Sequence, residues 1–260
     1  MPAPAPRRPL ATRQDVALIM VERRLRLWAK RSWVGMVWPI ATPLVLLALY
    51  LFVFKSVLRV QFHDYPAFLF SGLIPWTFLV NAVTNSVQSI SSDADLVRRS
   101  RFAYELLPLA CVAAAALFSL AVLAGFIVYQ AATGHLVYSV VGELVPALVS
   151  LYLFVGGLSM LVALFDLYNR DLRWVLGSLL TVWFFLLPIV YPQDRLGHRL
   201  SFLRSVDPMS LIIGEFRYAL VSGRVFEPIH VLDVFLISVA FFLACLVVFR
   251  RVSPQLPRVA

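Results

Sequence analysis

The side chains that could carry out chemistry are few and lie far apart in the sequence. The two cysteines, Cys111 and Cys245, fall inside apolar stretches, where cysteine usually serves as a small buried residue. No paired carboxylates, Ser-His pair or HExxH motif indicates a catalytic centre. The histidines lack the spacing of metal ligands; they are His63, His135, His198 and His230. The sequence therefore predicts neither a metal site nor an active site.

An energy source within the chain is not predicted either. The two lysines, Lys30 and Lys55, do not follow the Gly-x-x-x-x-Gly pattern of a phosphate-binding loop. Acidic residues lie near the ends of the apolar runs, which disfavours proton-driven transport. We therefore expect no cofactor on this chain, and any ATP and Mg²⁺ would be bound by a separate ATPase.

The composition is that of an integral membrane protein. Of the 260 residues, 61% are hydrophobic and 14% are charged, and the mean hydropathy is +0.84. The net charge of +9 would suggest nucleic-acid binding in a soluble protein. In a membrane protein, Arg and Lys gather on cytoplasmic flanks instead, so we expect no nucleic-acid partner.

Stretches between charged residues predict six transmembrane helices in an all-α fold. Sixteen of the 23 Arg and Lys residues fall on the side of the two termini, so both termini are expected in the cytoplasm. We expect a disordered tail at 1–13, an interface helix at 14–31, the transmembrane domain at 32–253 and a cytoplasmic tail at 254–260. The charge-free stretches lie between residues 31 and 55, 64 and 93, 105 and 143, 143 and 166, 173 and 194, and 229 and 250.

Two segments do not read as simple spans. Residues 14–31 predict an amphipathic helix along the cytoplasmic leaflet, although an ordinary basic flank would look similar. Residues 191–228 contain short apolar pieces broken by Gly and Pro, which favour re-entrant or interfacial helices over an external loop. The residues expected to contact lipid on the interface helix are Arg23, Arg24, Arg26, Trp28 and Lys30.

Six stretches, in order, together resemble the transmembrane subunit of type-2 bacterial ABC exporters of O-antigen, teichoic acid and capsular polysaccharide. They cover nearly the whole chain after the first dozen residues. They are RSWVGMVWPIATPLVLL at 31–47, DYPAFLFSGLIPWTFLVNAV at 64–83, DLVRRSRFAYELLPL at 95–109, ALFDLYNRDLRWV at 163–175, FFLLPIVYP at 184–192 and VDPMSLIIGEFRYALVSG at 206–223.

The resemblance implies a homodimer that forms a channel, two copies of a separate ATPase on the cytoplasmic side, and a lipid-linked polysaccharide as cargo. It also implies that two cytoplasmic loops contact the ATPase, although the first, as a bare charge run, could be only a topological anchor. The first coupling loop holds Asp93, Asp95, Arg98, Arg99, Arg101, Tyr104 and Glu105, and the second holds Asp166, Asn169, Arg170, Asp171 and Arg173. Residues 192–225 would form paired re-entrant helices near the outer mouth.

The chain departs from the family at a few of these positions. The family often has Pro-Arg where this chain has Ala103 and Tyr104, and Asn where it has Asp95, Asp166 and Asp207. These changes alter the charges available for coupling.

Aromatic side chains suit a sugar polymer because their faces pack against C–H groups. The candidates for channel lining are Trp76, Trp183, Phe184, Phe185 and Tyr191, although aromatic residues also form interfacial belts or face lipid. Two other functions stay open: an ABC exporter of a lipid, drug or small antibiotic, and a membrane enzyme acting on lipid-linked sugars.

Overall fold

The computed structural model describes residues 13–31, 33–57, 65–93, 97, 103–133, 141–169, 171–191, 207–222 and 228–255. These residues are helical throughout, apart from short turns, and contain no strand. The helices are α1 (Arg13–Arg31), α2 (Trp33–Leu51), α3 (Tyr65–Val87), α5 (Leu106–Ala132), α6 (Val141–Tyr168), α7 (Leu172–Leu186), α9 (Pro208–Arg217) and α10 (Pro228–Val252). Shorter helical turns are η1 (Phe52–Val57), η2 (Ser91–Asp93), η5 (Tyr218–Ser222) and η6 (Ser253–Gln255).

Five helices in the described part are long and apolar enough to cross a membrane. The predicted span between residues 173 and 194 instead holds α7, which has 15 residues. Such a helix is about 22 Å long, less than the roughly 30 Å of hydrocarbon. Helix α7 ends where Leu187 turns extended, as expected for a residue before proline. The five spans are Val37–Phe54, Tyr65–Val87, Leu106–Ala132, Gly142–Tyr168 and Val231–Gln255.

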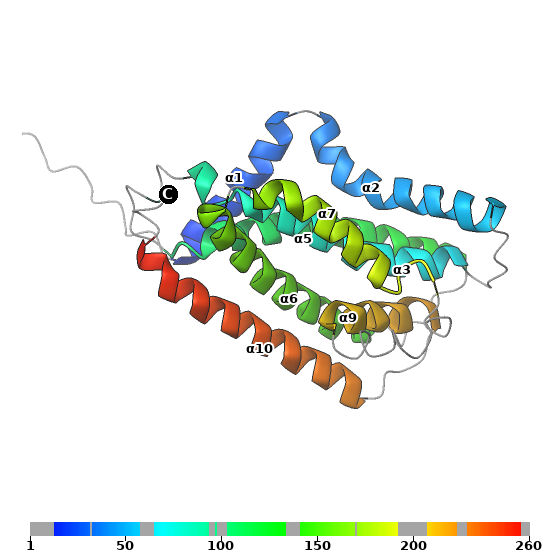
Figure 1. The fold of residues 1–260 in the computed structure, drawn as a ribbon. Helices are drawn as coiled ribbons and strands as arrows, with labels where there is room; N and C mark the ends of the chain where they lie inside the picture. Colours follow the sequence, from blue (N-terminus) through cyan, green and yellow to red (C-terminus); the bar gives the residue numbers. More distant parts are fainter. Residues whose placement is uncertain are drawn as a thin grey trace, which may run out of the picture.

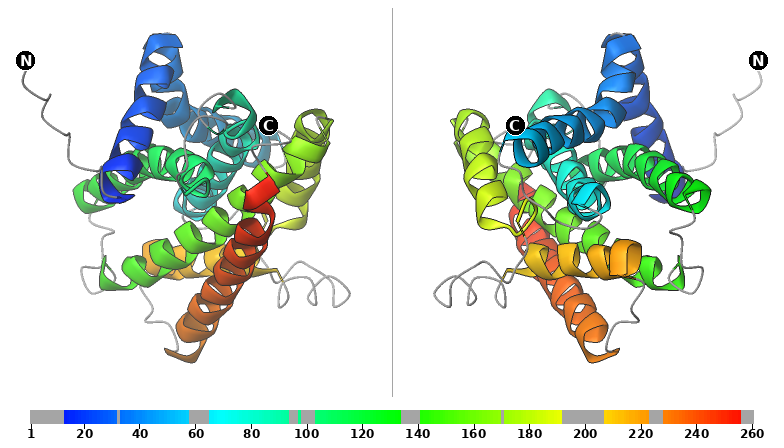
Figure 2. Two further views of the ribbon diagram at one scale, coloured as in Figure 1. Left: turned by 90° about the vertical axis from the view of Figure 1, so that its left-hand side faces the viewer. Right: turned by 90° about the vertical axis from the view of Figure 1, so that its right-hand side faces the viewer.

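The long helices run side by side, with α3 near the centre and α10 along one edge (Figure 1). Helices α1 and α2 meet at an angle, so that α1 reaches one end of the bundle while α2 runs along its outside (Figures 1 and 2). The opposite end holds α9 (Figure 1). We call these two ends the α1 end and the α9 end.

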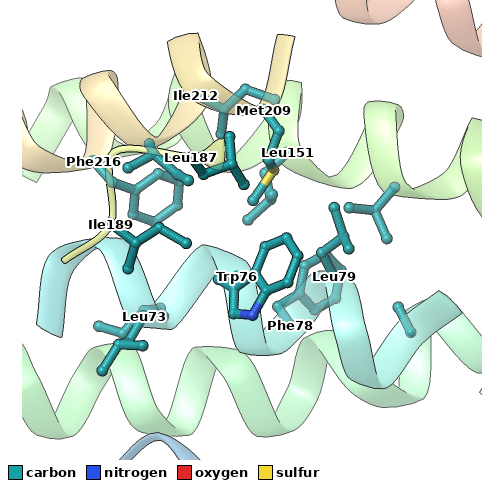
Figure 3. Close-up of a cluster of buried hydrophobic side chains, with 14 of the residues drawn as sticks. Leu73, Trp76, Phe78, Leu79, Leu151, Leu187, Ile189, Met209, Ile212 and Phe216 are labelled. Carbon is teal, nitrogen blue, oxygen red and sulfur yellow. The ribbon is translucent and has the colours of Figure 1, made fainter. Parts of the chain in front are cut away.

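The core is built around α3, whose side chains are buried along most of its length. Figure 3 shows Trp76 of α3 on the side of Met209 and Ile212 of α9, whereas the Phe78 ring lies 5.1 Å from that of Tyr152 in α6. Burial of these large apolar side chains fixes α9 against the bundle. Helix α9 is the ten-residue helix in the predicted re-entrant region. Residues 192–206 and 223–227 of that region lie outside the described residues.

Glycines allow α6 and α10 to pack closely. A Cβ atom on Gly157 would lie 3.0 Å from the Phe241 ring, and one on Gly156 would lie 3.2 Å from the Phe242 ring. Small residues at such positions are the usual means by which membrane helices approach one another. The two glycines therefore set the distance between α6 and α10.

Candidate functional site

Two arginines of α1 bind one carboxylate at the α1 end. Asp93, in η2, lies 2.7 Å from Arg23 Nη2 and 2.7 Å from Arg24 Nη2. Its side chain is 4% exposed, against 14% for Arg24 and 47% for Arg23. Arg24 also donates to the backbone oxygen of Ser89 at 3.0 Å. The Arg24–Asp93 pair is therefore the buried one, and it joins α1 to the segment that follows α3.

A second ion pair lies at the turn between α6 and α7. Arg173 Nε and Nη2 donate to the two carboxylate oxygens of Asp166 at 2.6 and 2.8 Å, and the Asp166 side chain is fully buried. Bidentate pairs of this kind are among the strongest polar contacts in proteins. The hydrogen bond to Asp166 raises the pKa of Arg173 above its ordinary value.

Ser91 connects the two ion pairs. Its hydroxyl donates to Asp166 Oδ2 at 3.2 Å and accepts from Arg173 Nη2 at 3.1 Å. Ser91 and Asp93 belong to the same short helix, η2. One network, which we call the charged network, therefore ties α1, the end of α3 and the α6–α7 turn together; it consists of Arg23, Arg24, Ser91, Asp93, Asp166 and Arg173.

The charged network joins residues that the sequence assigned to separate contacts. Asp93 comes from the first predicted coupling loop, and Asp166 and Arg173 come from the second. Arg23 and Arg24 were predicted to face lipid headgroups, yet both also bind Asp93. Residues of both loops therefore take part in one set of contacts, which includes the buried carboxylates of Asp93 and Asp166.

Four other predicted coupling residues have contacts of their own in the described structure. The Tyr104 hydroxyl donates to the backbone oxygen of Val97 at 3.4 Å. Glu105 pairs with Arg250 of α10 at 3.0 Å. Asn169 and Asp171 flank the α6–α7 turn, where their backbone groups hydrogen-bond to residues of the adjoining helices; the bonds are Asn169 N to Phe165 O and Trp174 N to Asp171 O.

The remaining predicted residues at this end are only partly described. Arg26 pairs with Glu22 one turn away on the exposed side of α1. Trp28 and Lys30 belong to α1, but their side chains are outside the described part. The other coupling candidates also fall outside the described residues; they are Asp95, Arg98, Arg99, Arg101 and Arg170.

A polar cavity of about 420 Å³ adjoins the charged network between α1, α3 and α5. In the residues described, no three His, Cys, Asp or Glu side chains approach closely enough to hold a metal ion. The described residues of the α1 end thus form a set of charged and polar contacts between α1, η2 and the α6–α7 turn. The cavity is lined by Arg23, Arg24, Leu27, Thr84, Asn85, Gln88, Ser92, Asp93 and Cys111.

The predicted aromatic residues form a cluster between helices. Trp76 of α3 meets Trp183 edge to face, with ring centroids 5.9 Å apart, and lies 5.6 Å from Phe184. Trp76 and Phe184 are buried within the chain. Phe185 is 61% exposed, and the Tyr191 hydroxyl donates to its backbone oxygen at 2.7 Å. Within one chain, Phe185 is therefore the most accessible of the five.

The aromatic cluster also fixes α9 to α7. Trp183 Nε1 donates to Asp207 Oδ2 at 2.7 Å. Asp207 caps the first turn of α9, because its Oδ1 accepts the backbone N–H of Met209 at 3.0 Å. Asp207, one of the positions where the resemblance led us to expect Asn, thus has two partners here.

Several residues of these contacts were not singled out from the sequence. Ser91 and Arg250 carry no local signal, because their partners lie 75 or more residues away. Arg217, at the α9 end, is an arginine within a largely apolar stretch, a pattern that marks functional positions in membrane proteins. That signal was available in the sequence.

Comparison with known proteins finds related permease proteins, although no protein-family profile matches the chain. Two O-antigen export system permease proteins RfbA of Klebsiella pneumoniae are 27% identical over 225 and 215 residues, which cover 84% and 80% of this chain and 85% and 81% of theirs. The O-antigen export system permease protein RfbA of Myxococcus xanthus is 27% identical over 214 residues, 78% of this chain and 79% of its own. The resemblance seen in the sequence is confirmed: the chain is a relative of the permease proteins of O-antigen export systems.

Proposed function

We propose that the chain is the channel-forming permease subunit of an ATP-driven exporter that moves a lipid-linked polysaccharide, such as O-antigen, across the cytoplasmic membrane. The similarity to O-antigen export permeases along about four-fifths of each chain carries this proposal. Five membrane-length helices and a composition poor in charge fit a transport subunit. The absence of a phosphate-binding loop from the sequence supports a division of labour in which a separate ATPase hydrolyses ATP.

The assembly is a homodimer with two ATPase copies, and both termini face the cytoplasm. Helix α7 is a short apolar helix that lies in the membrane beside the five spans. Its outward surface supports a role at the centre of the dimer, because Trp174 and Phe185 are 85% and 61% exposed. Helix α9 is a re-entrant helix at the outer mouth, where its ten residues are too short to span.

The charged network transmits ATPase movement to the spans. Closure of the ATPase dimer on ATP displaces the loops around Asp93 and Asp166, which are tied to each other through Ser91. Because both carboxylates are buried and paired, the loops and α1 move as one body rather than separately. The helices then shift between closed and open arrangements, and ATP changes the populations of the two.

The ATPase contact can be tested on the chain isolated with a tag in mild detergent. We expect ATPase activity to co-purify with the chain, and the variant Arg98→Glu/Arg99→Glu to lose most of it. Arg258→Glu, in the C-terminal tail, is the control for a general effect of charge reversal. Full ATPase activity in the double variant would contradict the proposed docking, whereas ATP hydrolysis by the chain without any second polypeptide would contradict the subunit division.

A further inference from the structure

A buried arginine holds the chain just after α7. Arg217, the last residue of α9, is 8% exposed, and its Nη2 donates to the backbone oxygen of Ile189 at 2.9 Å. Its guanidinium carbon lies 3.7 Å from the centre of the Phe68 ring. Gly72 makes room for this contact, because a Cβ atom there would lie 3.3 Å from both Arg217 Nη2 and Ile189 Cγ2.

The next carbonyl along the chain is held from another helix. The hydroxyl of Tyr65, at the start of α3, donates to the backbone oxygen of Val190 at 2.9 Å. Tyr65 also stacks on Phe68, with ring centroids 6.2 Å apart. Two successive carbonyls after Pro188 are thus bound by side chains of α9 and α3. Ile189 itself packs beside Phe216 in the core (Figure 3).

This arrangement leaves buried polar atoms without partners in the described part of the structure. Arg217 Nε and Nη1 have no hydrogen bond there, nor does either carboxylate oxygen of Glu215. Glu215 is 2% exposed. Unpaired buried polar groups oppose the arrangement that contains them, and both would be solvated if α9 moved toward water. Helix α9 therefore both stabilises this arrangement, through the hydrogen bond from Arg217 to Ile189, and destabilises it, through the unpaired atoms of Glu215 and Arg217.

Helix α7 links this region to the charged network. At the α1 end, Arg173 of α7 binds Asp166, and at the α9 end the bound carbonyls of Ile189 and Val190 come after Leu187 and Pro188, just beyond the end of the helix. Between these points α7 buries only Leu176, Leu180 and Phe184. Because α7 has defined contacts at both ends, a displacement of α7 at the α1 end would also move the segment that follows Leu186.

We propose that Arg217 and Tyr65 form a latch on the carbonyls of Ile189 and Val190 that keeps the α9 end of the export path closed until α7 is displaced from the α1 end. The role of this latch rests on the proposed function, whereas its contacts do not. Both residues act by positioning the segment after α7 and need not touch the cargo.

The latch can be tested by labelling a cysteine at Val190, which is 6% exposed. The background variant carries Val190→Cys together with Cys111→Ala and Cys245→Ala, which remove the two buried native cysteines. The full exporter is expressed in cells, and a membrane-impermeant maleimide is added from outside. We expect Tyr65→Phe to raise the labelling rate about fivefold, as for loss of one hydrogen bond. Arg217→Met removes a hydrogen bond and a ring contact, so its increase should be larger.

Tyr152→Phe is the matched control, because the Tyr152 hydroxyl is buried and has no partner in the described residues. It should leave the labelling rate unchanged. Rates within twofold of the background for both latch variants would overturn the proposal, as would an equal increase from Tyr152→Phe. If Arg217→Met fails to elute as a single species on gel filtration, Tyr65→Phe decides alone.

Surface polysaccharide, measured in the same strains, separates the latch from the proposed function. If the latch variants label faster but surface polysaccharide is the same with and without the chain, the latch stands and polysaccharide export is refuted. If surface polysaccharide depends on the chain but the latch variants label at the background rate, only the latch is refuted.

Discussion

Replacing Asp93 by Asn removes the carboxylate that two arginines of α1 share. The cost follows from exposure, because Asp93 and Arg24 are 4% and 14% exposed at their side chains and Arg23 is 47% exposed. Breaking a buried ion pair from one side costs about 3–5 kcal/mol, whereas an exposed pair contributes at most about 1 kcal/mol. We expect Asp93→Asn to lower stability by about 3 kcal/mol, since Arg24 would lose its only charged partner among the described residues.

The two arginine variants should follow in a fixed order. Arg24→Met should cost about 2 kcal/mol, because Asp93 keeps Arg23 as a partner. Arg23→Met should cost less than about 1 kcal/mol, because its side chain reaches water in any case. The combined Asp93→Asn/Arg24→Met variant should cost less than the sum of the two single changes, because they remove one contact.

The assay measures the thermal midpoint of unfolding of the purified chain in detergent. The midpoint is determined from the fraction of protein that stays monodisperse after heating to each temperature. For a chain of this size, about 3 kcal/mol corresponds to a decrease of about 6–12 °C. An equal decrease for Arg23→Met and Arg24→Met would refute the assignment of the buried pair. Additive losses in the combined variant would show that Arg24 and Asp93 do not stabilise each other.

Three further changes test other parts of the fold by the same thermal midpoint. Gly157→Ala should cost about 1–3 kcal/mol by crowding α10, whereas Gly177→Ala, with no atom within 4 Å of its Cβ position, should not destabilise the chain; equal effects would contradict the packing. Trp183→Phe should cost about 1–2 kcal/mol because it leaves Asp207 without the indole N–H, and no change would show that this bond does not stabilise α9. Arg250→Met should cost less than about 1 kcal/mol, since the Arg250 side chain is 57% exposed, and a decrease above about 5 °C would contradict that.

The sequence predicted where the apolar helices lie better than it predicted how long each helix is. Gaps between charges located five helices of membrane length, because burial in lipid excludes charged groups from each apolar run. The gap between residues 173 and 194 gave a 15-residue helix instead. A charge-free stretch shows how long the apolar segment is, but not where its helix ends. Here the helix ends at Leu186, because Pro188 forces the residue before it into an extended conformation.

The contacts among the coupling residues could not be predicted in the same way. Periodicity favoured helix α1, yet it could not show that Arg24 turns inward, because Asp93 lies 69 residues away. The link between Ser91 and Asp166 depends on how α3 and α6 pack, which no local pattern records. At the α9 end, the arginine at 217 could have been noticed in its apolar stretch, but not its acceptor, Ile189.

Export of a polysaccharide is the central claim, and a strain that lacks the chain tests it most directly. Lipid-linked glycans would be extracted, and the polymer would be quantified at the cell surface and inside the cell. The account predicts that polymer is missing from the surface and accumulates inside, and that the intact chain supplied in trans restores the surface polymer. Normal surface polymer without internal accumulation would contradict it.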